Sequence, residues 1–437
     1  MQLINIQDII QEARPTEEEI KEKSCTVDKV LTLISNEAEK VPQISGIEVG
    51  GSYAKGTWLA NSADIDVFVK FNKDVRREMF TKLSKRVGYN ALKDFDPYEK
   101  YAEHPYLIAE VDGVIINVVP CYDVEKGRWQ SAADRSPYHT RHMQEHLTES
   151  QKDEVRTLKK FLKNYNIYGA EIASQGFSGY AAETLILNFG GFLNVIQNIA
   201  HIKPGGVIGI TSKNFDTAVT ITDPIDNNRN LAAAISKRNI ALFILACRAF
   251  LKNPSRYTFE NRHTKNHNNW SNVICIKFRH TDKSLDVVWG QTKKTLSALK
   301  RQLQLHNFIV IKHHIAILEQ QIYIFLFLES FYLSKIFIRQ GPSVFLKNAT
   351  TSFIAKNNNI IWVSDDMTLL CLEDRQYTSI FEILDHLLTN PTAAGIPAGL
   401  HNDIKTYTLT GGEQFNDLIK QYAAPLMSDD GAAVSSH

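Results

Sequence analysis

The strongest structural signal in this 437-residue chain is GGSYAKGT at residues 50–57, followed by SADIDVFVKF at residues 62–71. Side chains of an extended strand alternate between its two faces, so Asp64, Asp66 and Phe68 are expected on one face. The other face is apolar and should be buried against a core; it carries Ile65, Val67, Val69 and Phe71. The pattern therefore predicts a buried strand that begins with two carboxylates projecting together.

Two carboxylates this close are unfavourable unless a cation lies between them. A site with few, hard oxygen ligands suits Mg²⁺ that also binds substrate phosphates. The preceding turn, Gly50-Gly51-Ser52, lets backbone N–H groups approach a polyphosphate with a hydroxyl beside them. A Gly-Gly-Ser turn is usually only a turn, and an isolated Asp-x-Asp is usually a solvated strand end. Their close succession in the chain indicates a site for a metal and a nucleotide phosphate.

The overall charge gives no sign of a nucleic-acid binder. Lysine and arginine total 49 and aspartate and glutamate 48, so the formal net charge is +1. This balance excludes a basic-tail nucleic-acid binder and an acidic disordered chain. A polyanion would have to meet positive charge that the fold gathers into patches. The length corresponds to about three domains.

Cysteine usage and hydropathy indicate the compartment. The five cysteines are widely spaced and form no Cys-x-x-Cys pair, which suits a reducing environment. The N-terminal residues are acidic and lack a signal-peptide pattern. The most apolar stretches, 240–251 and 322–333, are too short to span a bilayer. We therefore expect a cytoplasmic protein.

Local patterns predict several elements around the Asp-x-Asp strand. Residues 1–40 are expected to be helical, and residues 104–119 to form two strands joined at Asp112-Gly113. Thr148 and Gln151 form a capping box at the start of an amphipathic helix, and Gly169 is placed to end it.

The joint turn-and-carboxylate pattern resembles the nucleotidyltransferase superfamily typified by DNA polymerase beta. Further segments are similar to the archaeal-type (class I) CCA-adding enzymes. These segments are YAEHPY (101–106), VVPCY (118–122), DRSPYH (134–139), IYGAE (167–171), GFSGY (176–180), DPID (223–226) and RN (229–230). The similarity is dense from about residue 45 to 250 and thinner afterwards.

The resemblance implies an activity and an architecture. The family adds C, C and A to the tRNA 3′ end from CTP and ATP without a nucleic-acid template, releasing pyrophosphate, with two Mg²⁺ ions. It implies an α+β, multidomain fold whose domains embrace the tRNA acceptor arm, and a homodimer through the C-terminal half. We expect a catalytic head with a mixed sheet at 1–145, a helical central domain at 146–255, α/β C-terminal domains at 256–427, and a disordered tail at 428–437.

The resemblance also assigns site residues. Asp64 and Asp66 would be metal ligands. The triphosphate and nucleotide would contact Gly51, Ser52, Lys55, Ser136, His139, Lys159 and Tyr168, and Arg229 would read the base edge together with the RNA. The family usually has Arg where Lys55 stands, which replaces a bidentate group with a point charge. By spacing alone, Lys159 lies off the apolar stripe of its helix, and this favours a solvated face.

One position departs from the family pattern. The third carboxylate, a catalytic group and metal ligand, corresponds here to Asn117. Asn can offer a carbonyl oxygen to a metal but supplies no charge and accepts no proton. We therefore hypothesise that nucleotide and one Mg²⁺ still bind while the chemical step is impaired. Glu110 should lie about two residues further toward the turn and is a poor replacement. An engineered change and natural divergence would both give Asn117.

A second basic surface is predicted on a helix at 290–305. Leu296, Leu299 and Leu303 share one face, and the other carries Lys293, Lys294, Lys300 and Arg301. This is either an ordinary amphipathic surface helix or a stripe that follows RNA phosphates.

Three functions are compatible with these patterns. The first is a CCA-adding enzyme. The second is a catalytically degenerate tRNA-binding paralogue, which Asn117 keeps open. The third is another polymerase-beta-like RNA 3′-adenylyltransferase, such as a poly(A) or oligoadenylate enzyme, which would use ATP alone.

Overall fold

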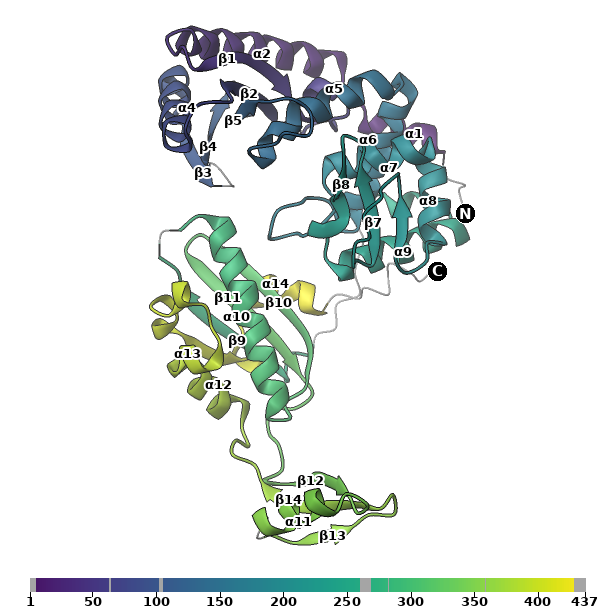
Figure 1. Cartoon of the computed structure of the whole chain (residues 1–437), viewed down its shortest axis with the longest axis vertical. Helices are drawn as coiled ribbons and strands as arrows, with labels where there is room; N and C mark the ends of the chain where they lie inside the picture. The colour runs from purple at the N-terminus through teal and green to yellow at the C-terminus, as the bar shows by residue number, and fades with distance from the viewer. Residues whose placement is uncertain are drawn as a thin grey trace. The chain divides into compact units, whose positions relative to one another are not determined.

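The computed structural model describes residues 5–62, 64–101, 105–259, 269–281, 283–357 and 359–427. This part of the chain forms two compact units, one before and one after residues 260–268 (Figure 1). Both contain helices and sheets, which agrees with the α+β, multidomain class expected from the sequence. In the described residues, no helix is both long enough and apolar enough to cross a membrane.

The N-terminal part of the first unit is built on a mixed five-stranded sheet. Its strands, in the spatial order β1-β2-β5-β4-β3, are β1 (Ile44–Gly50), β2 (Ile65–Asn72), β5 (Val114–Asp123), β4 (Pro105–Val111) and β3 (Tyr98–Tyr101). β2 and β5 are parallel, and the other neighbours are antiparallel. Helices α2 (Glu17–Ala38) and α4 (Arg77–Ala91) pack on each other and against this sheet (Figure 1).

The apolar alternation of β2 produces the expected buried face. Ile65, Val67 and Phe71 have no exposed surface, and they pack in one core with residues of α2 and α4. In α4, Phe80 lies 5.0 Å from the Phe71 ring and 4.2 Å from the Tyr122 ring of β5. This packing holds β2 and β5 together along their length, so the polar residues at their starts are also held in register.

The β4–β5 hairpin forms at the predicted turn. Asp112 and Gly113 have φ angles of 51° and 76°, as a tight type I′ hairpin turn requires. The register pairs Ile108 with Asn117 and Glu110 with Ile115. Glu110 is therefore displaced from Asn117 along the strand and is exposed, as the hairpin count predicts.

The rest of the first unit is mainly helical and surrounds an aromatic core. Its helices are α1 (Ile6–Ala13), α5 (Ser136–His146), α6 (Glu149–Asn164), α7 (Gly179–Phe189), α8 (Phe192–Ala200) and α9 (Lys237–Lys252). A small sheet contains β6 (Gly206–Ile208), β7 (Val219–Asp223) and β8 (Asp226–Asn230). Phe161 of α6 is fully buried at its centre. Its ring contacts those of Tyr165, Phe192, Phe243, Phe250 and Phe259.

The start of α6 agrees with the sequence prediction, and its end does not. The Thr148–Gln151 capping box is present, since each side chain accepts a hydrogen bond from the other residue's backbone N–H. The C-terminal prediction is wrong, because α6 ends at Asn164 and not at Gly169. Asn166, with φ of 54°, makes the left-handed turn that ends the helix. Gly169, also left-handed, lies in the following loop.

The second unit is described by itself. Its main sheet has the order β10-β11-β9-β15, with β9 (Val273–Arg279), β10 (Val310–Leu318), β11 (Gln321–Leu328) and β15 (Thr408–Gly411). Its helices include α10 (Leu285–Leu305), α12 (Ile380–Thr389), α13 (Pro391–Ala394) and α14 (Asp417–Met427). A smaller sheet, β12 (Ile336–Ser343), β14 (Thr368–Asp374) and β13 (Ile361–Val363), carries α11 (Lys347–Lys356). On α10, Leu296, Leu299 and Leu303 are buried, as their spacing predicts.

Replacing Phe161 with alanine should destabilise the first unit by about 3–5 kcal/mol, because the change opens a cavity at the centre of the aromatic core. The effect is measured in the full chain as the hydrogen-exchange rate of α6 peptides at increasing urea concentrations. Ile210→Ala, at a position that is 84% exposed, is the control and should leave the exchange unchanged. Equal exchange in the two variants would contradict the central role of Phe161.

Candidate active site

Three neighbouring strands bring the predicted metal-site residues together. Gly50 at the end of β1 lies opposite Asp66 of β2, and Asp66 lies opposite Asn117 of β5. The Asn117 Nδ2 amide donates a hydrogen bond of 2.9 Å to Asp66 Oδ1. Asp64, just before β2, is exposed. The sheet thus presents a carboxylate and an amide side by side, with a second carboxylate near them in solvent.

The electrostatics of Asp66 favour a bound cation. Burial raises the pKa of Asp66 above its ordinary value, and the negative charge of Asp64 raises it further. The hydrogen bond from Asn117 and the positive charge of Lys55 oppose this shift but do not cancel it. A carboxylate that is costly to ionise in the free protein gains stability when a cation is placed against it.

Gly51 fits against Asp66 because it has no side chain. Its φ is +67°, and a Cβ atom there would lie 2.0 Å from Asp66 Oδ2. Gly51 begins the short helix α3 (Gly51–Lys55), which also carries Ser52 and Lys55. The Gly-Gly-Ser turn is therefore in direct contact with the carboxylate, as a joint metal and phosphate site requires.

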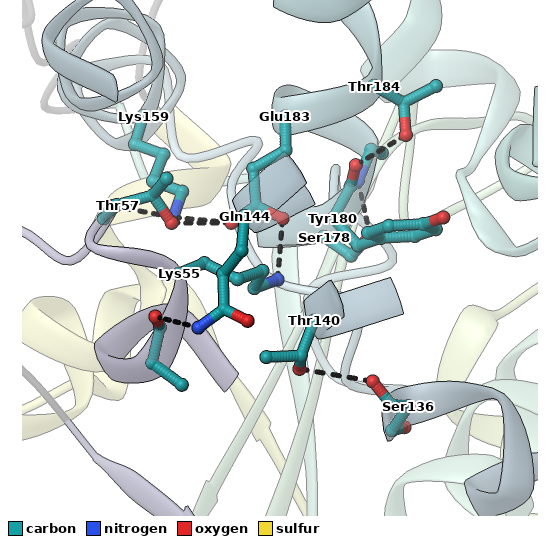
Figure 2. A network of polar contacts seen from close by, with 12 residues as sticks. Lys55, Thr57, Ser136, Thr140, Gln144, Lys159, Ser178, Tyr180, Glu183 and Thr184 are labelled. Carbon is teal, nitrogen blue, oxygen red and sulfur yellow. Dashed lines mark hydrogen bonds and ion pairs between the residues drawn. The ribbon is translucent and has the colours of Figure 1, made fainter. Parts of the chain in front are cut away.

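Behind α3 lies a buried network of four polar side chains (Figure 2). The Lys55 Nζ ammonium lies 2.5 Å from Glu183 Oε2, and Thr57 Oγ1 donates to Glu183 Oε1 at 2.5 Å. Lys159 Nζ donates to the Thr57 carbonyl at 2.9 Å and also contacts Thr57 Oγ1 at 3.2 Å and Glu183 Oε1 at 3.5 Å. We call these residues, Lys55, Thr57, Lys159 and Glu183, the lysine–glutamate network.

Lys159 is not on a solvated face. Its side chain is only 1% exposed, so the expectation drawn from helix spacing is wrong. Burial lowers the pKa of Lys159 to about 8, although the charge of Glu183 opposes the shift. The polar side of α6 is covered at this point by Thr57, a hundred residues earlier in the chain, and helix periodicity carries no information about such a partner.

Glu183 is a buried site residue that the sequence patterns did not predict. Its side chain has no exposed surface, and burial would raise its pKa, but Lys55, Lys159 and Thr57 together lower the pKa below its ordinary value. One signal for it was available: α7 reads GYAAETLILNF, in which Glu183 is the single charged residue of a mainly apolar helix. An acid in such a helix is buried only if it has a cationic partner.

A second buried carboxylate organises the other side of the site. Asp223 Oδ2 contacts His139 Nε2 and Arg229 Nη1, each at 3.0 Å. Asp223 Oδ1 accepts from the Tyr180 hydroxyl and from the Ile225 backbone N–H, also at 3.0 Å each. Burial alone would raise the pKa of Asp223, but His139, Ile225 and Arg229 lower it to about 2. We call this group the Asp223 cluster.

Tyr180 connects the two groups. Its ring stacks on the His139 ring with a centroid separation of 3.8 Å, and the Lys55 ammonium lies 5.5 Å from the centre of the same Tyr180 ring. Tyr168 lies close by, since a Cβ on Gly179 would be 3.1 Å from the Tyr168 hydroxyl and 3.5 Å from Lys159 Nζ. Burial, followed by the charges of Glu183 and Glu171, raises the pKa of Tyr168.

Ser136 is the remaining residue predicted to contact nucleotide. It begins α5, the helix that carries His139, and its carbonyl accepts from Thr140 Oγ1 at 3.1 Å (Figure 2). The first unit therefore holds every residue predicted to contact metal or nucleotide. Lys293, Lys294, Lys300 and Arg301 belong to α10 of the second unit.

The donor set suits Mg²⁺ better than a softer metal. Asp64, Asp66 and the Asn117 carbonyl are hard oxygen donors. Among the residues that the structure describes, no three His, Cys, Asp or Glu side chains are grouped so as to hold a metal ion. Two carboxylates and one amide fit a cation that completes its coordination with substrate phosphates and water.

The mixed sheet, the Asp-x-Asp strand and the adjoining Gly-Gly-Ser turn define a polymerase-beta-like nucleotidyltransferase. Family models agree over successive segments: a nucleotidyltransferase domain at 32–140, the second domain of tRNA nucleotidyltransferase at 153–260, and the C-terminal domain of CCA-adding enzymes at 271–404. The chain belongs to the archaeal-type CCA-adding enzymes, which are tRNA nucleotidyltransferases.

Curated relatives carry the same family name. The CCA-adding enzyme of Saccharolobus islandicus is 37% identical over 374 residues, which are 85% of this chain and 88% of the relative. That of Sulfolobus acidocaldarius is 35% identical over 84% of this chain and 90% of its own length. Among solved structures, a cytoplasmic RNA terminal U-transferase covers 59% of this chain and 97% of its own, with 14% identity and a TM-score of 0.45.

Glu183→Gln should destabilise the first unit by about 3–5 kcal/mol, because it leaves two buried lysines without a counter-charge. The loss should be largest between the lowered pKa of Glu183 and that of Lys159, about 8. Below this window Glu183 is neutral in the unmodified chain as well; above it Lys159 has lost its proton, so less charge needs compensation. Denaturant titrations across pH measure the window. Glu149→Gln, at a side chain that is 89% exposed, is the control, and an equal loss there would contradict the prediction.

Gly51→Ala should abolish nucleotide binding, because the new methyl group would displace Asp66. Gly56→Ala is a matched control: Gly56 has the same φ of +67°, but its Cβ would meet nothing closer than Lys152 Cδ at 3.4 Å. Both variants carry the left-handed backbone cost of about 1–2 kcal/mol, and only the first carries the clash. Calorimetric titration with CTP and Mg²⁺ tests the difference; similar affinities would show that the close approach is unimportant.

Proposed function

We propose that this chain transfers two CMP units and one AMP unit from CTP and ATP to the 3′ end of tRNA and releases pyrophosphate. The observation that carries the proposal is the contact between the Gly51 turn and Asp66, with Asp64 beside it. This arrangement offers oxygen ligands to a metal and a glycine turn to its phosphates within one small space.

The proposed roles follow from the contacts of each residue. Asp64 and Asp66 hold Mg²⁺, with the Asn117 carbonyl as a weaker ligand. The Gly51 backbone N–H, the Ser52 hydroxyl and Lys55 bind the triphosphate. The Lys55 ammonium has three N–H donors and gives one to Glu183, so donors remain for a phosphate. When bound, Mg²⁺ would offset phosphate charge and favour ionisation of the attacking 3′-hydroxyl.

Lys159 acts indirectly in this proposal. Its three N–H donors have three acceptors within the lysine–glutamate network, and burial separates it from solvent. It would thus support Thr57 and Glu183, and through Glu183 the position of Lys55. Ser136, His139 and Tyr168 line the same region and would contact the nucleotide, and Arg229 would meet the base.

Asn117 is proposed to slow the chemical step without preventing nucleotide binding. Its amide donates to Asp66 and so stabilises that carboxylate in the absence of a metal. An aspartate at this position would bring a third negative charge and attract a second cation, whereas the amide cannot. The second candidate function, a tRNA-binding paralogue with little turnover, rests on this same residue.

Asn117→Asp should raise the rate of CMP incorporation about a thousandfold, which corresponds to roughly 4 kcal/mol of activation free energy. Single-turnover assays with labelled CTP, Mg²⁺ and tRNA lacking CCA measure the rate. Calorimetry of CTP binding is the control and should change little. Equal rates would refute the impairment, and absence of incorporation by both chains despite tRNA binding would favour the paralogue. Incorporation of ATP alone would indicate another adenylyltransferase.

The basic residues of α10 are proposed to contact tRNA phosphates. Lys294 and Arg301 are exposed, while Lys293 and Lys300 are half-buried. Lys293 lies 5.9 Å from the Trp289 ring centre, and Lys300 Nζ lies 3.3 Å from His313 Nδ1. Both lysines are therefore held near the helix surface, where they can add to the charge of Lys294 and Arg301. A homodimer through the second unit belongs to the same proposal.

Replacing Lys294 and Arg301 with alanine should weaken tRNA binding and reduce its salt dependence by about one unit of log–log slope for each lost phosphate contact. Binding isotherms at several salt concentrations give the slope. Lys405→Ala, an exposed lysine elsewhere in the second unit, is the control. A slope that stays the same in the double variant would count against this RNA surface.

A further inference from the structure

The Asp223 cluster gathers residues from distant parts of the chain onto one carboxylate. Asp223 itself has no exposed surface, and each of its oxygens meets two partners. Oδ2 is shared by His139, from α5, and Arg229, from β8. These are two residues to which the proposed function gives nucleotide contacts, while Asp223 has no role in it.

The Asp223 carboxylate determines which nitrogen of His139 carries the proton. An ionised carboxylate can only accept hydrogen bonds, so His139 Nε2, at 3.0 Å, must be the donor. Burial lowers the pKa of His139 below its ordinary value even though Asp223 opposes the shift, which favours the neutral ring. In a neutral ring with Nε2–H, Nδ1 is a hydrogen-bond acceptor. The ring is also held in orientation by its stacking on Tyr180.

Arg229 is anchored at one end by the same oxygen. Its Nη1 donates to Asp223, while its side chain remains 42% exposed. A guanidinium has five N–H donors in a rigid plane, so anchoring one nitrogen restricts the directions in which the others can point. The cluster therefore holds a fixed donor, Arg229, and a fixed acceptor, His139 Nδ1, through one carboxylate.

We propose that Asp223 is a positioning residue for base selection, which holds Arg229 as donor and His139 Nδ1 as acceptor toward the incoming base. The inference rests on the proposed function, in which both residues face the nucleotide. Cytosine and adenine share an exocyclic amino donor beside a ring-nitrogen acceptor. Uracil presents a carbonyl acceptor and a ring N–H instead. A fixed donor–acceptor pair therefore accepts the first two bases and rejects the third.

The first test is the ratio of kcat/KM for CTP to that for UTP, with tRNA lacking CCA as acceptor. Asp223→Asn should lower this ratio at least about tenfold, because an amide can donate to His139 and no longer attracts Arg229. The assay is run in the native chain and in the Asn117→Asp background, so that a slow chemical step does not hide selectivity. A merely structural role would lower both rates and leave the ratio unchanged, and that result would overturn the proposal.

Two neighbouring variants serve as controls for the ratio. Asp226 lies on the same hairpin and pairs with Arg135 at 3.0 Å, so Asp226→Asn removes a partly buried ion pair and leaves the side chains of the Asp223 cluster unchanged. Tyr180→Phe removes the hydroxyl donor to Oδ1 but leaves both contacts to Oδ2. Both should keep the CTP preference of the unmodified chain. Loss of the preference in Asp226→Asn would overturn a specific role for Asp223.

The second test does not depend on activity. In the ¹⁵N-histidine spectrum of the full chain, with the His139 signals assigned from a His139→Gln variant, His139 should be the Nε2–H tautomer. In Asp223→Asn the ring should shift toward Nδ1–H or exchange between the two forms. An unchanged tautomer would overturn the inference. If no chain incorporates either nucleotide, the proposed function fails, and this spectrum still decides whether Asp223 positions His139.

Discussion

The first unit depends on one buried carboxylate that faces two lysines. Glu183 is inaccessible to solvent and is compensated by Lys55 and Lys159, which approach from α3 and α6. Buried charges are tolerated only when they are paired and hydrogen-bonded, so this carboxylate requires α3, α6 and α7 to meet in one arrangement. The carbonyls of Gly56 and Trp58 reinforce that arrangement by accepting from Arg156 of α6. The turn that approaches Asp66 is thereby fixed from behind.

The same principle operates on each side of the site with a different result. In the lysine–glutamate network the carboxylate holds Lys55, the cation that is proposed to bind phosphates. In the Asp223 cluster it contacts a histidine and an arginine that are proposed to meet the nucleotide. Between them, the Asp66 carboxylate accepts a hydrogen bond from the Asn117 amide. Asn117 therefore stabilises the Asp66 carboxylate by a hydrogen bond but adds no charge of its own.

Much of this could be predicted from local sequence. The alternation after Asp64 predicted the buried face of β2, and Asp112-Gly113 predicted the turn and register that place Asn117. The cap of α6 at Thr148, which also depends on neighbouring residues only, was predicted correctly. Two predictions from local rules were wrong. The end of α6 was expected at Gly169, but Asn166 makes the turn that ends it. Lys159 was expected on a solvated face, but Thr57 and Glu183, which are distant in sequence, cover it. Glu183 was overlooked for the same reason.

The sequence by itself determined the family, the α+β class and the residues that meet at the sheet edge, because strand alternation and turn chemistry act over a few residues. The tertiary structure alone decided which charges are buried and with what partners. Pairs such as Lys55 with Glu183 and His139 with Asp223 join positions more than eighty residues apart. Their energies depend on burial and on distances of about 3 Å, and these arise only when the helices pack.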